Sequence, residues 1–337
     1  MQKFKILVFT DHSGHSVENS IYALLLALKQ QPNCDYIEVA SRGLVANKSF
    51  FQDLKGTQLT VSRVDDTFQY SAEGSFFHQQ QKQVDLRDYD VLFLRLPHPI
   101  RPGFWDHLIS HFPEQCIFNQ PTGIQISGNK RFLLELAEWC PPIRLCQNKA
   151  AVLAFAKKFP IVLKPLEGYG GKGIVRIDQG KAWLGNQAIN LDEFLTEMET
   201  QNQVYLGMKY LKNVTEGDKR IVVIYGQVIG ASLRLPPEDS WLCNAAQGGQ
   251  SVNTSLRPEE ELMAKDLSEK LGKLGVMFFG FDTLVDDHGQ RVLSEVNTLS
   301  IGGLKQMDAK QKEQQLLSKA ANQIIDYIQN EIIIPKK

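Results

Sequence analysis

Residues 162–174 read VLKPLEGYGGKGI, an apolar run with one lysine that leads into a cluster of glycines. Gly168, Gly170 and Gly173 fit the spacing G-x-G-x-x-G, and Val175 extends it to G-x-G-x-x-G-x-V. More than one class of nucleotide-binding loop uses this spacing, and chance also produces it. The flanking residues therefore have to decide which structure the glycines form.

The residues around the glycines exclude the best-known versions of this loop. A Rossmann turn opens a helix, whereas residues 174–177 (IVRI) alternate like a strand. A protein kinase carries H-R-D and D-F-G motifs further along the chain, and a P-loop reads G-x-x-x-x-G-K-[ST]; this sequence has neither set. What remains is a strand–loop–strand unit whose lysine, Lys164, lies upstream of the glycines.

Such a unit suits a phosphate group. Four glycines in six residues, with Gly171 as the fourth, allow backbone N–H groups to close over a phosphate. Lys164 supplies a positive charge at the entrance to the loop. A surface hairpin without a ligand is the plain alternative, and the loop alone does not decide between the two.

A second pattern, in residues 278–297, favours the phosphate interpretation. If His288–Gly289 is a two-residue turn, Asp282 lies directly across from Glu295, and Asn297 points to the same face two residues later. Two carboxylates and an amide oxygen form a ligand set suited to Mg²⁺. The alternative is an exposed polar sheet face, but both carboxylates sit in mostly apolar runs, where an uncompensated charge is costly.

Composition limits the classes of partner. The chain has 337 residues, enough for two or three compact units, and a net charge of −1, which does not favour a nucleic-acid partner. The apolar start meets Asp11 too early for a signal peptide or a membrane span. Five cysteines without a C-x-x-C motif predict buried free thiols and a cytoplasmic protein.

The first third of the chain alternates strands and helices. The stretches at 4–10 (FKILVFT) and 88–96 (DYDVLFLRL) are apolar runs of the kind that a parallel sheet buries on both faces. The stretch at 116–121 (CIFNQP) predicts a short last strand. Together these runs indicate an open α/β domain.

The remainder predicts helices between strand–loop–strand units. A helix is expected over 129–140, where two prolines end it, and YGQ at 225–227 predicts a hairpin turn. Proline at position 258 followed by three glutamates predicts a helix start. A last amphipathic helix is expected over 309–330.

Taken in order, these motifs resemble a known family. The set NQP, GNK, IVLKPLEGYGGKGI, GDKRIVV, NAAQGGQ, GFD and SEVN resembles the ATP-grasp superfamily, most closely the bacterial-type glutathione synthetases, and the resemblance covers most of the chain. It implies an α/β protein with an open α/β N-terminal substrate domain at residues 1–122. An ATP-grasp fold would follow, in which two antiparallel α+β subdomains, 123–203 with the glycine loop and 204–337 with the metal site, clasp ATP.

The resemblance also implies ATP and Mg²⁺ as cofactors, with Mn²⁺ as the alternative ion. Lys130 and Lys164 would reach the ATP phosphates or the adenine, and the glycine loop would close over the γ-phosphate. The other implied nucleotide contacts are a hinge and a ribose-binding carboxylate: Lys209, Tyr210, Leu211 and Asp218. The implied metal ligands are Asp282, Glu295 and Asn297.

Further positions match residues that serve the reacting groups. The implied nucleotide, phosphate or acyl contacts are Lys219, Arg220, Arg234 and Asn244. In the first domain, relatives read R-K-D-P-P where this chain reads RLPHP at 95–99, so Arg95 remains without its charged neighbours. Relatives carry a T-S-P-T-type segment where this chain reads TLSIGG at 298–303, which makes Ser300, Gly302 and Gly303 the candidate substrate contacts.

The implied activity is ATP-dependent amide formation through an acyl phosphate, as in glutathione synthetase, which joins γ-glutamylcysteine to glycine. One alternative is an ATP-grasp peptide or glutamate ligase with another acid and amine. A nucleotide-binding protein that makes no amide is the third hypothesis, which the intact lysines and metal set disfavour. The expected partners are small molecules, with no nucleic acid and no membrane; the sequence is compatible with a homo-oligomer.

Overall fold

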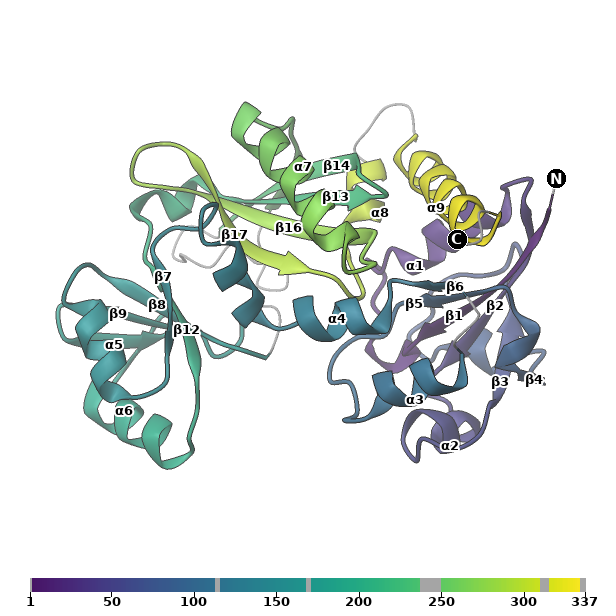
Figure 1. Ribbon diagram of the computed structural model, residues 1–337, viewed down its shortest axis with the longest axis horizontal. Helices are drawn as coiled ribbons and strands as arrows, with labels where there is room; N and C mark the ends of the chain where they lie inside the picture. Colours follow the sequence, from purple (N-terminus) through teal and green to yellow (C-terminus); the bar gives the residue numbers. More distant parts are fainter. Residues whose placement is uncertain (1, 113–115, 168–170, 237–249, 310–314, 334–337) are drawn as a thin grey trace.

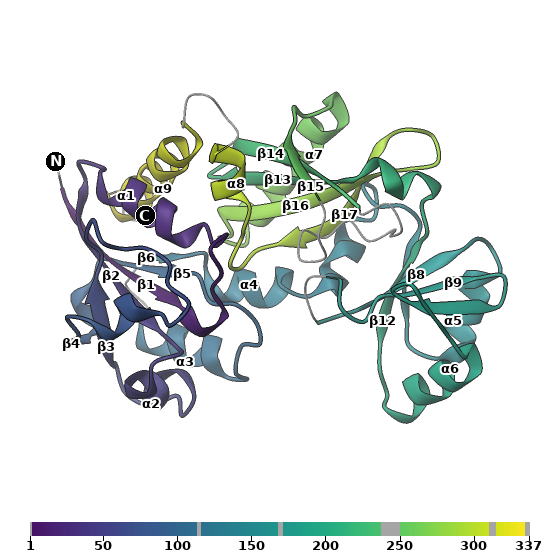
Figure 2. The same ribbon diagram turned by 180° about the vertical axis from the view of Figure 1, so that it is seen from behind.

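The chain forms three sheets, and the computed structural model describes residues 2–112, 116–167, 171–236, 250–309 and 315–333. The first and second sheets lie towards opposite ends of the molecule, with the third sheet between them (Figure 1). The last helix returns to the N-terminal end and packs beside the first helix, as Figure 2 shows from behind. This is the arrangement that the resemblance implies, an open α/β domain followed by two antiparallel subdomains.

The first sheet has the order β4-β3-β2-β1-β5-β6, parallel from β2 to β6 and antiparallel at β3 and β4. Its strands are β1 (Phe4–Thr10), β2 (Cys34–Ser41), β3 (Gln58–Arg63), β4 (Lys82–Asp85), β5 (Val91–Leu94) and β6 (Cys116–Phe118). The accompanying helices are α1 (Ile21–Lys29), α2 (Lys48–Phe51), α3 (Phe104–His111) and α4 (Pro121–Ser127). Short 3₁₀ turns are η1 (His12–Gly14), η2 (Val45–Asn47), η3 (Ser75–His78) and η4 (Leu86–Asp88). The three apolar runs predicted as strands form β1, β5 and β6.

The second sheet is antiparallel throughout, with the order β11-β10-β9-β8-β12-β7. Its strands are β7 (Ile143–Cys146), β8 (Ile161–Pro165), β9 (Val175–Asp178), β10 (Lys181–Leu184), β11 (Gln187–Ile189) and β12 (Tyr205–Lys209). Helices α5 (Lys149–Ala156) and α6 (Leu191–Thr200) accompany it. Strand β12 pairs with β8 and β7, so this sheet extends beyond residue 203, where the sequence suggested a boundary.

The third sheet is also antiparallel, with the order β15-β14-β13-β16-β17. Its strands are β13 (Asp218–Ile224), β14 (Gln227–Leu235), β15 (Gln250–Asn253), β16 (Phe278–Val285) and β17 (Arg291–Asn297). The helices of this part are α7 (Pro258–Gly272), α8 (Leu304–Ala309) and α9 (Leu316–Ile333). The expected turn at 225–227 is present, because Tyr225 and Gly226 have positive φ angles of 48° and 74° between the paired residues of β13 and β14.

Two hydrophobic clusters join the sheets to one another. One cluster combines β1, β2 and α1 of the first sheet with β13, β16 and α9, and another combines β8 and β12 of the second sheet with β13, β16 and α7. The amide of Asn119 adds a polar connection between the first and third sheets. It accepts from the N–H groups of Met277 and Phe278 at 2.9 and 2.8 Å and donates to the carbonyls of Phe278 and Thr298 at 2.6 and 2.9 Å.

The segment expected as a helix over 129–140 forms 3₁₀ turns instead, η5 (Lys130–Leu136); a second such turn, η6 (Lys212–Glu216), follows β12. The side chain of Asn129 caps η5 by accepting from the Arg131 N–H at 2.9 Å. The Lys130 N–H donates to the carbonyl of Leu166 at 3.2 Å, just beyond β8. This contact with the second sheet overrides the intrinsic helix propensity of the segment.

Among the described residues, no helix is long and apolar enough to cross a membrane. Four of the five cysteines lie in this part of the chain, and all four are free thiols. Cys34 and Cys146 are buried as the sequence predicts, whereas Cys116 and Cys140 are only partly buried. The fifth, Cys243, lies outside the described residues.

Helix α4 approaches the connection between α7 and β16 so closely that residue 123 has no room for a side chain. A Cβ atom on Gly123 would lie 2.1 Å from the carbonyl oxygen of Leu274. We expect Gly123→Ala to lower the free energy of unfolding by about 1–3 kcal/mol, because the backbone of one element must move. Thermal melting measures the change, with Gly14→Ala, where a Cβ meets nothing within 4 Å, as the control. Equal melting temperatures for both variants would contradict this close packing.

Candidate active site

The two lysines that the sequence assigns to the nucleotide converge on strand β17. Lys164, near the end of β8, is 8% exposed, and its Nζ donates to the carbonyl and the hydroxyl of Ser294, each at 3.0 Å. Lys130 Nζ lies 3.9 Å from Glu295 Oε1. Burial lowers the pKa of Lys130, while the charge of Glu295 acts in the opposite direction. The structure therefore brings two cations from separate segments to neighbouring residues of the predicted metal hairpin.

The described part of the glycine loop has the backbone conformation that requires glycine. Gly171 and Gly173 both have φ angles of 73°, in the left-handed region. A Cβ atom on Gly173 would lie 3.0 Å from Cγ of Pro165, so the returning chain passes close to the end of β8. Gly168 and Gly170 lie outside the described residues.

The predicted pairing of the metal hairpin is confirmed, but the predicted turn is wrong. Asp282 lies across from Glu295, and Asn297 lies across from Gly280. The Asp286 N–H donates to the Gln290 carbonyl at 2.8 Å, so the loop has three residues, with Gly289 at φ 84°. The extra loop residue shifts the register by one, and a bulge between Asp282 and Thr283 shifts it back.

Asp282 is surrounded by arginines from the two neighbouring strands. Arg220 of β13 contacts both of its carboxylate oxygens, with Nη2 at 2.7 Å from Oδ2, and Arg234 of β14 approaches Oδ2 at 2.9 Å. Arg234 also donates to Asp218 at 2.5 Å. The predicted residues Asp218, Arg220, Arg234 and Asp282 thus form one charge cluster, in which the aspartates are buried and the arginines are partly buried.

The two aspartates of this cluster differ in acidity. Burial, together with the charge of Asp282, raises the pKa of Asp218 to about 7 against the effect of Arg234. Burial also opposes ionisation of Asp282, but the charges and hydrogen bonds of Arg220 and Arg234 outweigh it and hold the pKa at about 2. Asp282 therefore remains a carboxylate at neutral pH.

The donor set on this face fits a hard divalent cation. Asp282 and Glu295 offer carboxylate oxygens, and Asn297 offers its amide oxygen. Mg²⁺ prefers oxygen ligands of this kind. Among the described residues no group of three or more His, Cys, Asp and Glu side chains could hold a metal ion, so the set depends on Asn297. The Nδ2 atom of Asn297 is buried without a hydrogen-bond partner among the described residues. A carboxylate has about four lone-pair positions, so Asp282 retains acceptor capacity beside its arginines.

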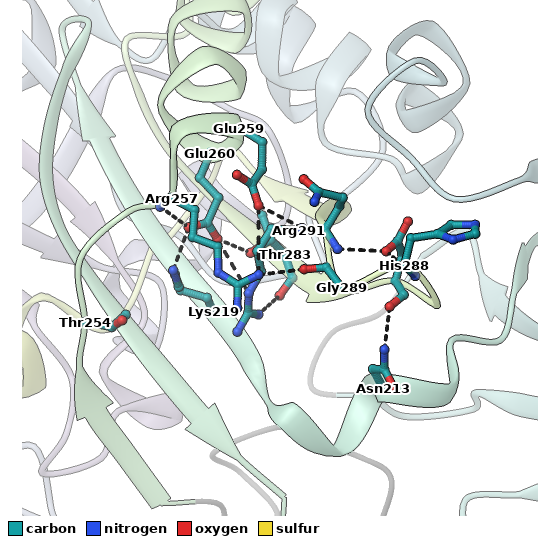
Figure 3. A network of polar contacts seen from close by, with 12 residues as sticks. Asn213, Lys219, Thr254, Arg257, Glu259, Glu260, Thr283, His288, Gly289 and Arg291 are labelled. Atoms are coloured by element: carbon teal, nitrogen blue, oxygen red, sulfur yellow. Dashed lines mark hydrogen bonds and ion pairs between the residues drawn. The ribbon is translucent and has the colours of Figure 1, made fainter.

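Lys219 does not belong to this cluster, contrary to the sequence-based assignment. Its neighbours Asp218 and Arg220 point to the charged face of β13, so alternation directs Lys219 to the opposite face, towards α7. There its Nζ donates to Glu260 at 2.6 Å (Figure 3). It also donates to the Ser255 carbonyl at 2.9 Å. Lys219 is 3% exposed and Glu260 is fully buried. The pair is structural.

Glu260 is the centre of this second network. It also accepts from the Thr283 hydroxyl at 2.6 Å and from the Arg257 N–H at 2.8 Å, while Arg291 lies nearby (Figure 3). From the sequence, Glu260 is only an acidic residue in the first turn of a predicted helix. Its partner was not predictable, because nothing in the sequence shows that β13 and α7 pack together at this point.

The predicted hinge leads directly out of β12. The Lys209 and Tyr210 N–H groups donate to the carbonyls of Pro142 and Pro160, each at 2.8 Å. The Lys209 side chain forms an ion pair with Asp287 at 2.7 Å, and Asn213 donates to the Asp286 carbonyl at 2.7 Å. The hinge and the tip of the metal hairpin are therefore attached to each other.

Arg95 lies at the end of the first sheet, beside the segment that follows Asn297. It is 3% exposed, donates to the Ile301 carbonyl at 2.5 Å and lies over the ring of Phe278, 5.1 Å from its centroid. Burial lowers its pKa to about 10, so it remains a cation. Its Nε and Nη1 atoms are buried without partners among the described residues.

The post-metal segment has an unusual backbone. Ser300 has a φ of 51° and Gly303 a φ of 103°. A Cβ atom on Gly302 would meet nothing within 4 Å, and one on Gly303 would lie 3.8 Å from Cγ of Arg220. The segment thus runs from Arg95 towards the charge cluster. Asn244, the remaining predicted site residue, lies outside the described residues.

The position of Lys219 generates a prediction about stability. Lys219→Met should lower the free energy of unfolding by about 3–5 kcal/mol, because it leaves the Glu260 charge buried without its cation. The control is Lys270→Met, which removes a surface lysine that pairs with Glu138 and Asp266 and should cost about 0–1 kcal/mol. Denaturant unfolding measures both. A Lys219→Met protein of normal stability that fails to bind nucleotide would restore the original assignment.

Comparison with known proteins supports the resemblance. The family model described as prokaryotic glutathione synthetase, ATP-grasp domain, matches residues 129–312. A glutathione synthetase of Rhodopseudomonas palustris is 30% identical over 227 residues, covering 66% of this chain and 69% of the relative. A glutathione synthetase of Mesorhizobium japonicum is 28% identical over 253 residues, covering 73% of this chain and 77% of the relative.

A solved structure shows the same fold over nearly the whole chain. The crystal structure of D-cycloserine synthetase DcsG matches with a TM-score of 0.66 at 14% sequence identity, covering 96% of this chain and 99% of that one. At this identity the likeness concerns the fold alone. The family assignment rests on the sequence matches, which include the lysines, the glycine loop and the metal hairpin within residues 129–312. The chain therefore belongs to the prokaryotic glutathione synthetase family and is an ATP-grasp, ATP-dependent ligase of the glutathione synthetase type.

Proposed function

We propose that this ligase joins a small carboxylic acid to a small amine through an acyl phosphate, with γ-glutamylcysteine and glycine as the first pair to test. The observation that supports the site is the convergence of Lys130 and Lys164 on Ser294 and Glu295. Two cations from separate segments, next to a paired carboxylate hairpin, suit the polyphosphate of a nucleotide.

The nucleotide contacts follow from the neighbourhood of these lysines. Lys130 and Lys164 contact the phosphates, and the loop from Gly168 to Gly173 closes over the γ-phosphate. At the hinge, the N–H groups of Lys209 and Tyr210 are engaged by prolyl carbonyls, so we assign adenine recognition to the N–H of Leu211. Asp218 approaches the ribose; its bond to Arg234 then has to rearrange or be shared.

Asp282, Glu295 and Asn297 would hold Mg²⁺, with Mn²⁺ as the alternative ion. The bound cation would neutralise negative charge on the phosphoryl group during its transfer. Arg220 and Arg234 would also neutralise this negative charge, since both already lie beside Asp282. Their positions also keep the buried carboxylates compensated before the nucleotide arrives.

The reaction needs no covalent enzyme nucleophile. A carboxylate oxygen of the acid attacks the γ-phosphorus and releases ADP, which forms the acyl phosphate. The amine then attacks the acyl carbon, inorganic phosphate leaves and the amine loses its proton. Exclusion of water protects the acyl phosphate, which is the role proposed for the glycine loop. Asn244 is proposed to contact the transferred phosphate or the acyl group.

Two arginines are the proposed anchors of the acid. Arg234, within the charge cluster, holds the reacting end close to the γ-phosphate, and Arg95 holds the far end. Unpartnered Nε and Nη1 atoms on Arg95 support this role, because a buried guanidinium normally has hydrogen-bond acceptors. A planar carboxylate pairs with such a group through two parallel hydrogen bonds. Ser300, Gly302 and Gly303 would contact the amine or the acid.

The altered segments at 95–99 and 298–303 favour the alternative that another acid and amine are joined. Both segments lie where Arg95 meets the post-metal backbone, so changes there act on the substrates and leave the nucleotide contacts alone. We also propose a cytoplasmic location, free small-molecule substrates and no nucleic-acid partner, in keeping with the net charge of −1. A homo-oligomer is compatible with these features, and size-exclusion chromatography measures it.

The direct test supplies γ-glutamylcysteine, glycine, ATP and Mg²⁺ and measures amide, ADP and phosphate. We expect the three products in equal amounts. Phosphate release with other acid–amine pairs but none with this pair would assign the chain to a different ligation. Nucleotide binding without phosphate release for any pair would contradict ligase activity.

Glu295→Gln tests the metal set. Loss of one carboxylate ligand should reduce Mg²⁺-dependent turnover by about 100-fold or more, while the fold is retained. The matched control is Glu197→Gln, on the exposed face of α6, which should have wild-type activity. Turnover is measured across a Mg²⁺ titration, and circular dichroism reports the fold. Normal turnover with an unchanged magnesium requirement would rule out this ligand assignment.

Arg95→Met tests the acid anchor. Removal of the guanidinium should raise KM for the acid by the equivalent of about 2–3 kcal/mol, because charged hydrogen bonds are lost, with little change in KM for ATP. Arg101→Met, an exposed arginine of the same loop, is the control. Steady-state kinetics with each substrate varied in turn separate the two constants. An equal rise in both would mean that Arg95 only supports the fold.

A further inference from the structure

One arginine on the second sheet has a position that the proposed mechanism does not explain. Arg176 lies on β9, three residues after Gly173, and pairs across the sheet with Val162 of β8 and Trp183 of β10. Its guanidinium lies over two aromatic rings, 4.9 Å from the centroid of Trp183 and 4.5 Å from the centroid of Tyr210. Tyr210 belongs to the hinge, so this arginine connects the strand after the glycine loop to the segment that would receive the adenine.

The face on which Arg176 lies is the one that looks towards the third sheet. Its neighbours Val175 and Ile177 are in the hydrophobic cluster that the sheet shares with α5 and α6. Val162, its cross-strand partner, instead packs in the cluster that contains residues of β13, β16 and α7. Because cross-strand partners share a face, Arg176 lies on the same side as Lys164, whose Nζ reaches β17.

The side chain of Arg176 is more buried and makes more contacts than that of a typical surface arginine. Its side chain is 27% exposed, and its Nη2 lies 3.3 Å from Asp178. Its Nε atom is buried and has no hydrogen-bond partner among the described residues. A guanidinium that covers two rings and lacks a partner for a buried N–H is available to fix the ring positions and to meet a polar group of a ligand.

We propose that Arg176 is a positioning residue of the nucleotide site, one that holds the Tyr210 segment of the hinge against β9 and β10 so that the Leu211 N–H meets the adenine edge. The inference rests on the proposed function of the hinge. It adds a determinant of base selection, because a hinge that loses its support presents its N–H and carbonyl groups less accurately to adenine. Loss of Arg176 should then weaken adenine recognition more than phosphate recognition.

Arg176→Met retains the length of the side chain and removes both the charge and the planar stack. We expect it to raise the dissociation constant for ADP with Mg²⁺ by about tenfold and to raise the constant for GDP less, so that the preference for adenine falls. KM for ATP should rise in parallel, with kcat and KM for the acid within about twofold of wild type. Arg176→Lys should recover part of the affinity, since a cation remains over the rings.

Arg144→Met is the matched control. Arg144 lies in the same sheet, 5.8 Å from the centroid of Phe155, on the side of α5, and should bind both nucleotides like the wild type. Calorimetric titration with ADP and GDP measures binding, and thermal melting checks the fold. A second readout is tryptophan fluorescence: the change on ADP binding should be smaller in Trp183→Phe, which removes one of the four tryptophans.

The outcomes separate this inference from the proposed function. Wild-type affinity and base preference in Arg176→Met would overturn it, and so would an equal loss of ADP and GDP affinity, which indicates a purely structural role. If Arg176→Met does not fold, Arg176→Lys provides the test, with the same requirement that the ADP preference falls. A wild-type protein that binds neither nucleotide would overturn the proposed function and this inference with it.

Discussion

The register between β16 and β17 is the constraint on which the rest of the site depends. A three-residue loop alone would set Asp282 against the wrong neighbour and direct Glu295 and Asn297 away from it. The bulge between Asp282 and Thr283 restores the pairing and leaves Ser294 as the extra residue. Ser294 then accepts two hydrogen bonds from Lys164, so the irregularity that places Asp282 opposite Glu295 also links the second sheet to the third.

Successive side chains of β13 point to opposite faces of the third sheet, so its charged residues belong to two separate sets. Asp218 and Arg220 face the cluster around Asp282, where arginines keep the buried carboxylates ionised or compensated. Lys219 faces α7 and pairs with Glu260, where the charge supports the packing of the helix. Of these three consecutive charged residues, Asp218 and Arg220 belong to the charge cluster and Lys219 supports the packing of α7. The motif alone would assign all three residues to the cluster.

The first sheet is attached to the third through both apolar and polar contacts. Asn119 forms four hydrogen bonds with the start of β16 and the residue after Asn297, and α9 packs beside α1. Arg95 donates to the Ile301 carbonyl, in the segment that follows Asn297. Under the proposed role of Arg95, an acid bound to it would be held relative to Asp282 by the protein backbone.

The sequence by itself determined the strand–loop–strand unit around Lys164 and the helix from Pro258, and its ordered motifs resemble the family to which the chain belongs. The strand–loop–strand unit and the helix follow from local patterns: glycine spacing, alternation along a strand and the residues of a helix start. The sequence also predicted that Asp282 lies across from Glu295, but from a two-residue turn, and the pairing holds because a bulge offsets the longer loop. The tertiary structure alone decided the bulge at Ser294, the orientation of Lys219 towards Glu260, the 3₁₀ form of residues 130–136 and the stacking of Arg176 between Trp183 and Tyr210. Each of these depends on which distant segment packs against the residue, and a pattern of neighbours along the chain contains no information about that contact.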